Sequence, residues 1–176
     1  MLTEDYYVAN KLMKGFIGSA NIDTNSRLCR SSAVAAHGRA FGEDIVPCTY
    51  EDLDQADLIV LVGSNTAWCH PVIHQRIVAA RAARGTRVVV IDPRRTETCI
   101  DADLHLALRP GSDVALFNGV LADCRDNDLL DLAYLAAHVA VPEDFWAALD
   151  HCGLAETAQA CDLAERDLAA FYELFA

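Results

Sequence analysis

The sequence predicts an α/β fold in which a three-layer, doubly wound (Rossmann-like) sheet of about three mostly parallel strands is followed by a helical C-terminal part. Short continuous apolar runs at residues 58–62 and 87–91 indicate two buried strands. The amphipathic stretch 71–85 between them indicates a helix, and the order of strand and helix recurs after residue 104. A strand, helix and strand of these lengths form a βαβ unit, so we expect parallel strands and a right-handed crossover.

Length and composition fit one globular domain. With 176 residues, of which 53% are hydrophobic, the chain can bury a core of its own. We therefore expect a single α/β domain over residues 1–176. Within it, residues 1–20 form an N-terminal helix, residues 21–128 form the βα units that bind a ligand, and residues 129–176 form a helical segment.

The net charge and the cysteines limit the possible partners and compartments. A formal net charge of −12 argues against a nucleic acid or an anionic membrane as partner, because phosphate binding needs an array of Lys and Arg side chains. The seven cysteines are widely spaced and form no CxxC pair, so neither a disulfide framework nor a zinc or iron–sulfur site is predicted. Together with the lack of an apolar signal or membrane segment, this usage predicts a cytoplasmic protein.

The N-terminal quarter predicts helices that flank a polar, irregular segment. Residues 3–17 form the first helix, with Thr3 as its cap. Residues 31–41 form the second helix, which ends before Gly42. A capping box at residues 49–52 predicts a short helix just before the first strand.

The rest of the chain continues the alternation and then becomes helical. The first two strands are expected to be buried on both faces, because their apolar runs do not alternate with polar residues. A short helix near residues 96–101 leads to a third strand at 104–108, and a helix follows at 114–124. Three further amphipathic helices are predicted after residue 129, at residues 130–139, 143–152 and 163–175.

Three loops follow the carboxyl ends of the strands, where open parallel sheets bind their ligands. The first, a Gly-Ser-Asn-Thr turn, offers backbone N–H groups to a diphosphate. It lacks the second and third glycines of a GxGxxG motif, so an ordinary strand-to-helix turn is an equal alternative. The turn consists of Gly63, Ser64, Asn65 and Thr66.

The second and third loops each contain an acidic residue. Asp92 ends the second strand, where nucleotide-binding domains hold a ribose, although an isolated acid at such a place is more often an ordinary capping residue. Arg94 faces either a phosphate or solvent. Asp113 has two oxygens that match the N1–H and exocyclic amine of guanine, but an acid in the first turn of a helix is also favoured by the helix dipole.

Cys29 is the candidate reactive residue of the polar segment 21–32. Arg27 lies two residues before it, and a predicted helix N-terminus with Ser31 and Ser32 follows, a setting that stabilises a thiolate. The alternative is that Cys29 is a small buried apolar residue, as most lone cysteines are.

Several segments together resemble the molybdopterin oxidoreductase family. The similarity covers residues 21–35 around Cys29 and three further motifs in the family's order and spacing, namely 61–68, 90–96 and 109–113. Residues 3–12 also fit. Within the family the chain is most similar to the catalytic subunits of bacterial assimilatory nitrate reductases, which have Cys at the position of Cys29, where formate dehydrogenases have selenocysteine or Cys.

This resemblance implies a role for each matching residue. Cys29 would be the catalytic thiolate ligand of a molybdenum ion held by two molybdopterin guanine dinucleotides, since soft sulfur ligands suit a metal that changes redox state. Asn25 would lie against this cofactor. The remaining implied contacts are Gly63, Ser64, Asn65 and Thr66 with the diphosphate, Asp92 and Arg94 with a ribose or phosphate, and Ser112 and Asp113 with the guanine.

The implied reaction is the two-electron reduction of nitrate to nitrite by oxygen-atom transfer to Mo(IV), with electrons from a donor protein or domain. Arg30 stands where related nitrate reductases usually have Met. The four-cysteine domain that binds a 4Fe–4S cluster in the family is absent from these 176 residues, so we expect a fragment that is inactive by itself. Two alternatives remain, namely a formate dehydrogenase or other member of the same family, and a nucleotide- or cofactor-binding module without catalysis.

Overall fold

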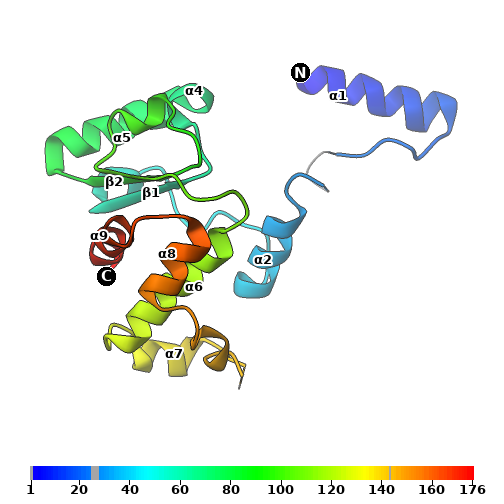
Figure 1. Ribbon diagram of the computed structural model, residues 1–176. Coiled ribbons are helices and arrows are strands. Elements are labelled where there is room, and N and C mark those ends of the chain that lie inside the picture. The colour runs from blue at the N-terminus through cyan, green and yellow to red at the C-terminus, as the bar shows by residue number, and fades with distance from the viewer. Residues whose placement is uncertain (1, 25–27, 143) are drawn as a thin grey trace. The chain divides into compact units, whose positions relative to one another are not determined.

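A computed structural model of the chain describes residues 2–24, 28–142 and 144–176 (Figure 1). These residues form two compact units, Met1–Cys48 and Thr49–Ala176. The expectation of one domain over 1–176 stays a prediction, and each unit has its own set of elements.

The first unit contains helices at the two predicted places. Helix α1 (Thr3–Asn10) continues into the π-helical η1 (Lys11–Ile17), and α2 (Ser31–Phe41) ends at Gly42. The predicted cap is wrong, because the carboxylate of Asp5 accepts a hydrogen bond from the N–H of Leu2 at 2.9 Å and Thr3 is already helical. No described residue of this unit is buried.

The second unit is built on a parallel sheet with strand order β1-β2-β3, which confirms the predicted α/β class. The strands are β1 (Leu58–Val62), β2 (Arg87–Ile91) and β3 (Leu104–Leu106). Strand β1 lies at the edge and only its Ile59 is buried, so the expectation of full burial is correct for β2 but wrong for β1.

Strand β3 is two residues shorter than predicted. Its last ladder bond runs from the N–H of Asp92 to the carbonyl of Leu106, at 3.2 Å. The next bond of this ladder would have to reach the carbonyl of Asp92, which lies 2.8 Å from His105 Nε2 instead, so the pairing stops there.

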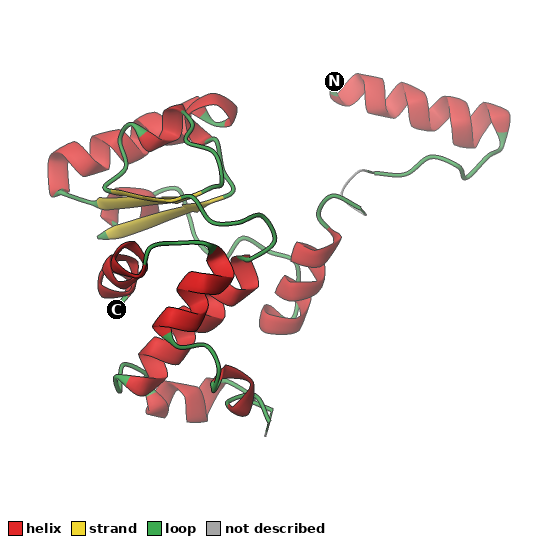
Figure 2. Ribbon diagram, viewed as in Figure 1, coloured by secondary structure: helices red, strands yellow, loops and turns green. Residues whose placement is uncertain are grey.

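Helices cover both faces of this sheet and give the predicted three layers (Figure 2). Val88 and Val90 pack with one group of elements, and the alternating Val89 and Ile91 pack with the other, as the two-residue period of a strand requires. The first group comprises α3 (Asp52–Gln55), α5 (Pro71–Arg84) and η3 (Glu97–Cys99). The second comprises α6 (Asp113–Asp126), α8 (Leu154–Cys161) and α9 (Glu165–Phe175).

The C-terminal part differs from the prediction in two places. Helix α7 (Leu132–His138) lies close to the helix predicted at 130–139. The prediction of a helix at 143–152 is wrong, because the described residues there form turns and a short 3₁₀ segment, η4 (Ala147–Leu149). Helix α8 was not predicted. It starts after Gly153 without a side-chain cap and stops at Asp162, which has a left-handed backbone (φ 57°), so neither end carries a strong sequence signal.

Short helix α4 (Thr66–Cys69) was also missed, because the sequence indicated only a tight turn before Pro71. The predicted start of α5 at Pro71 is confirmed. Pro at this position is favourable because the first N–H of a helix has no intrahelical acceptor.

Candidate functional site

The three predicted loops leave the same edge of the sheet, because all three strands are parallel. Thr98 joins the first two loops, since its hydroxyl donates to Asn65 Oδ1 at 3.0 Å and accepts from the N–H of Ala67 at 3.1 Å. His105 Nε2 lies 2.8 Å from the carbonyl oxygen of Asp92 and links the second loop to β3. These contacts connect the carboxyl edge into one surface of the second unit.

The first loop keeps several backbone donors free. Gly63 has a positive φ of 58° and donates its N–H to the carbonyl of Ile91 at 2.8 Å. Within the described ranges, the N–H groups of Ser64, Asn65 and Thr66 have no hydrogen-bond acceptor. Unpaired N–H groups on successive residues suit an anion such as a diphosphate.

The second loop contains a buried carboxylate and a buried hydroxyl. Asp92 is 7% exposed, and its Oδ1 accepts a hydrogen bond from the N–H of Arg94 at 2.8 Å. The hydroxyl of Thr96 is buried and has no partner among the described residues. An unpaired buried hydroxyl costs about 1–3 kcal/mol, so this loop fits a group with hydroxyls of its own, such as a ribose.

The two predicted residues of the third loop, Ser112 and Asp113, have different surroundings. Ser112 is 6% exposed and donates its hydroxyl proton to the carbonyl of Arg109 at 2.6 Å, so this group closes the loop. Asp113 begins α6 and is exposed, and no described residue pairs with its carboxylate. Both oxygens of Asp113 are therefore available to a ligand that presents two donors.

Cys29 belongs to the first unit, whereas the three loops belong to the second. Its side chain is a free, exposed thiol just before α2. The hydroxyl of Ser31 donates to the carbonyl of Leu28 at 3.2 Å, and the guanidinium of Arg30 pairs with Asp44. Arg30 is therefore not a free cation.

Two residues of the sequence argument, Asn25 and Arg27, lie outside the described residues. The predicted roles of Asn25 and Cys29 stay predictions. The residues that sequence reasoning missed are Thr96, Thr98 and His105. No local pattern distinguishes them, because their importance comes from contacts with the other loops.

No protein-only metal site is present among the described residues, where no three His, Cys, Asp or Glu side chains gather. None of the helices in the described ranges is long and apolar enough to cross a membrane.

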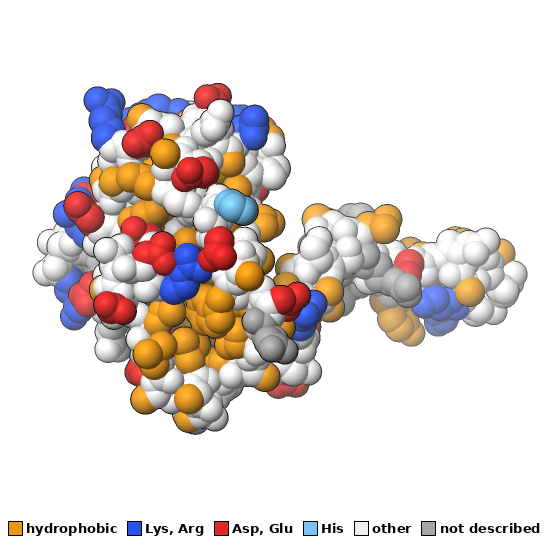
Figure 3. Space-filling model, turned by 60° about the horizontal axis from the view of Figure 1, so that its bottom comes forward, with side chains coloured by type: hydrophobic (Ala, Val, Ile, Leu, Met, Phe, Trp, Pro, Cys, Tyr) orange, Lys and Arg blue, Asp and Glu red, His pale blue; other side chains and the backbone are white. Residues whose placement is uncertain are grey.

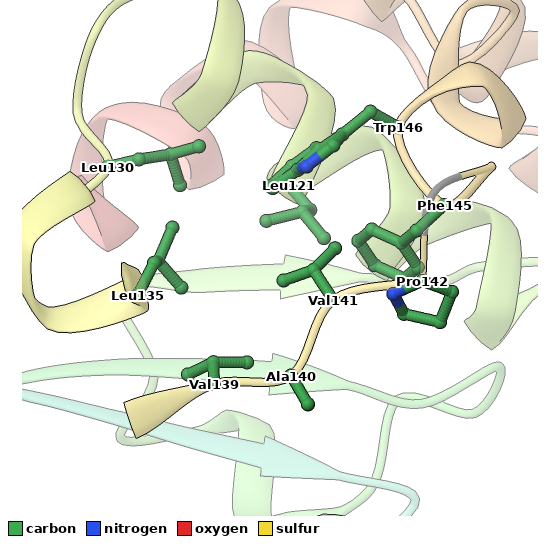
Figure 4. A pocket seen from close by; sticks show the side chains of 9 residues that line it. All are labelled: Leu121, Leu130, Leu135, Val139, Ala140, Val141, Pro142, Phe145 and Trp146. Atoms are coloured by element: carbon green, nitrogen blue, oxygen red, sulfur yellow. The ribbon is translucent and has the colours of Figure 1, made fainter. Parts of the chain in front are cut away.

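A separate hollow lies away from the carboxyl edge, on the side of the unit that carries α7, where hydrophobic side chains gather (Figure 3). It has a volume of about 230 Å³, and no charged residue lines it (Figure 4). The lining residues are Leu121, Leu130, Leu135, Val139, Ala140, Val141, Pro142, Phe145 and Trp146. This hollow does not fit a charged dinucleotide.

The second unit therefore has the architecture of a Rossmann-like nucleotide-binding domain, with polar loops at the carboxyl edge of a parallel sheet. The Molybdopterin oxidoreductase family model matches residues 1–128, and the chain belongs to this family. The description of this family is that of a molybdopterin oxidoreductase.

Nitrate reductases are among the curated relatives that match over most of the chain. The chain is 62% identical to the nitrate reductase of Shewanella frigidimarina over 138 residues, which are 78% of this chain and 15% of that protein. It is 53% identical to the nitrate reductase of Klebsiella oxytoca over 182 residues, or 99% of this chain and 20% of that protein. The chain thus spans about a fifth or less of the length of these two relatives.

Among solved structures, acetylene hydratase from Pelobacter acetylenicus matches with a TM-score of 0.73 at 23% identity. The match covers 96% of this chain and 23% of that chain. At this identity the likeness concerns the fold alone, and it agrees with the α/β class.

Proposed function

We propose that the chain supplies the Cys29 ligand of molybdenum and part of the site for bis(molybdopterin guanine dinucleotide) in an enzyme that reduces nitrate to nitrite. The observation that carries the proposal is the 53% identity to the nitrate reductase of Klebsiella oxytoca over 99% of the chain. The unpaired donors and the open carboxylate at the carboxyl edge support it, because they match the groups of a guanine dinucleotide.

Each loop has a distinct task in this proposal. The N–H groups of Ser64, Asn65 and Thr66 bind the diphosphate, and Gly63 gives the turn its shape. Asp92 accepts a ribose hydroxyl, and the exposed Arg94 binds a phosphate. Asp113 pairs with guanine, and Ser112 holds the loop that carries it. Asn25 lies against the cofactor.

The cofactor, when bound, supplies the two-electron redox couple. Cys29 contributes a thiolate to the metal, so its thiol must lose a proton on loading. The residues of the carboxyl edge bind and orient the nucleotide end and take no part in bond breaking.

The proposal extends to the pathway, the compartment and the electron supply of the enzyme. The enzyme acts in nitrate assimilation in the cytoplasm, receives electrons from a donor protein or domain, and carries a 4Fe–4S cluster outside these 176 residues. No nucleic acid or membrane takes part. The widely spaced free cysteines and the net charge of −12 support these assignments.

Replacing Cys29 in the enzyme that contains this chain tests the proposal. Cys29→Ser should lower molybdenum content and nitrate-dependent oxidation of reduced viologen at least tenfold, whereas Cys48→Ser, at another exposed cysteine of the same unit, should leave both unchanged. Equal metal content and activity in wild type and Cys29→Ser would favour a non-catalytic cofactor-binding module.

A formate dehydrogenase is the second candidate. The chain is 38% identical to the F420-dependent formate dehydrogenase 1 subunit alpha of Methanococcus maripaludis over 132 residues. Assaying the same enzyme with formate in place of nitrate separates the two, since only one substrate should support turnover. We also expect the 176 residues alone to be inactive, so steady nitrite formation by them with a viologen donor would contradict this part of the proposal.

A further inference from the structure

The C-terminal end of α8 holds the third loop of the carboxyl edge through three hydrogen bonds. The backbone N–H of Arg109 donates to the carbonyl of Cys161 at 2.8 Å. The guanidinium of Arg109 donates to the carbonyl of Ala160 at 2.5 Å, and the thiol of Cys161 donates to the carbonyl of Ser112 at 3.6 Å. These contacts join segments about 50 residues apart in the chain.

The carbonyls of Ala160 and Cys161 are free to accept because they lie in the last turn of α8. Asp162 follows with a left-handed backbone, so the helix cannot continue and its last carbonyls have no helical N–H partners. A guanidinium is a favourable donor at a helix C-terminus, because it also meets the negative end of the helix dipole. Helix α8 therefore offers a fixed anchor to the loop.

Two of the residues that this anchor joins are buried, one in α8 and one in the loop. Cys161 is fully buried, and Ser112 is 6% exposed. Burial raises the pKa of the Cys161 thiol, so at neutral pH it retains the proton that it donates to Ser112. Within the loop, Gly111 adopts a φ of 85° and the Ser112 hydroxyl donates back to Arg109.

We propose that the end of α8 positions Asp113 for recognition of the guanine base, with Arg109 and Cys161 as positioning residues. Ser112 directly precedes Asp113, so the bonds that hold Ser112 also set the direction of the Asp113 carboxylate. Recognition of two donors by one carboxylate depends on this direction, because both hydrogen bonds must be nearly linear. The proposal rests on the proposed function, since it assumes that Asp113 faces guanine.

Helix α8 lies outside residues 1–128, the part of the chain that matches the family model. If Cys161 served only to fill the core, its substitution would lower stability and change nothing else. A positioning role also predicts a loss of base selectivity, and recovery when the donor is restored. The two roles are therefore separable.

The test uses NMR titrations of the 176-residue chain with GDP and with ADP, following the backbone amide of Asp113. Wild type should bind GDP more tightly than ADP. Cys161→Ala, which removes the donor to Ser112, should reduce this preference about fivefold and speed amide exchange of Ser112 by a similar factor, the size expected for one hydrogen bond. Arg109→Ala should act in the same direction, while Cys161→Ser should recover part of the preference.

Cys124→Ala is the matched control, because Cys124 packs against the same core but lies near the other end of α6. It should leave the preference for GDP unchanged. If wild type prefers GDP and Cys161→Ala keeps the full preference, the positioning role is wrong and the proposed function stands. If wild type shows no preference for GDP over ADP, the assignment of guanine to Asp113 fails and the positioning role fails with it.

Discussion

At the residue scale, Thr96 and Thr98 form a contrasting pair on one short segment. The Thr98 hydroxyl makes two hydrogen bonds that join the loops of β1 and β2. The Thr96 hydroxyl is buried without a partner among the described residues. The first hydroxyl therefore stabilises the fold, and the second carries a free-energy cost that a hydrogen bond to a ligand or water would relieve.

Valine substitutions at both positions should reveal this difference. Thr96→Val keeps the side-chain shape, so the free energy of unfolding should stay the same or rise by up to about 1 kcal/mol. Thr98→Val should lower it by about 1–3 kcal/mol, because it leaves Asn65 and Ala67 without their partner. Urea denaturation measures both, and an equal loss in the two variants would contradict this account.

Asp103 is the residue on which acid stability should depend most clearly. Its side chain is 14% exposed, and it lies 3.1 Å from the guanidinium of Arg87, pairs with Arg81 and accepts the N–H of Val88 at 2.8 Å. Burial by itself raises the pKa of Asp103, but the hydrogen bond from Arg81, the bond from Val88 and the two positive charges outweigh it and lower the pKa.

A lowered pKa in the folded state means that ionised Asp103 contributes stability above its unfolded value of about 3.9. This contribution is lost as the pH falls through the lower folded value. Asp103→Asn should reduce the free energy of unfolding at pH 7 by about 1–3 kcal/mol. It should also make the fall of this free energy below pH 4 less steep. Denaturation curves between pH 7 and pH 2 test this, with Asp57→Asn, at a fully exposed side chain, as a control that should change little.

At the element scale, the contact between α6 and α9 depends on one glycine. A Cβ added at Gly119 would lie 2.3 Å from Tyr172 Oη and 2.5 Å from Thr157 Oγ1. Tyr172 is 5% exposed, and burial raises the pKa of its phenol to about 12. The absence of a side chain at Gly119 lets the helices approach this closely.

Gly119→Ala should therefore lower the free energy of unfolding by about 1–3 kcal/mol, the usual cost of overpacking a core. Tyr172→Phe removes the hydroxyl nearest the added methyl group and should recover part of this loss in the double variant. A control comes from Gly38→Ala in α2, where no atom lies within 4 Å of the added group and the better helix propensity should be neutral or favourable. Equal effects at the two glycines would exclude a steric origin.

At the scale of the whole molecule, every buried core residue that the structure describes lies in Thr49–Ala176. Its two groups of buried residues, one on each face of the sheet, include Phe171, Leu168 and Ile91, each at most 1% exposed. Burying a side chain of this size contributes about 1.5–3 kcal/mol. The described part of Met1–Cys48 has no such residues and should have little stability of its own.

Limited proteolysis with trypsin tests this difference. The bonds after Lys11, Lys14 and Arg39 should be cut first, leaving a resistant product that begins within the first unit and contains the whole sheet. Early cleavage after Arg81 or Arg84 in α5, at a rate equal to that at Lys14, would show that the second unit is not the stable part.

The sequence by itself determined the α/β class, the places of the three strands and the loops at their carboxyl ends. These features follow from local patterns, because apolar runs define buried strands and Gly or Pro residues define where elements stop. The same local signals placed Asp92 and Asp113 at one edge once the strands were known to be parallel. The family resemblance implied that these residues bind one particular cofactor, which local patterns do not show and which stays a prediction.

Tertiary structure alone decided what happens after residue 140 and how the loops are held. The predicted helix at 143–152 gives way to turns in which the carbonyl of Trp146 accepts a bond from Arg125. Ser112 uses its hydroxyl proton to close its own loop, and Cys161 holds that loop from 49 residues away. Such contacts leave no periodic trace in the sequence, because the distance between the partners along the chain is set by the fold and not by a helix or strand repeat.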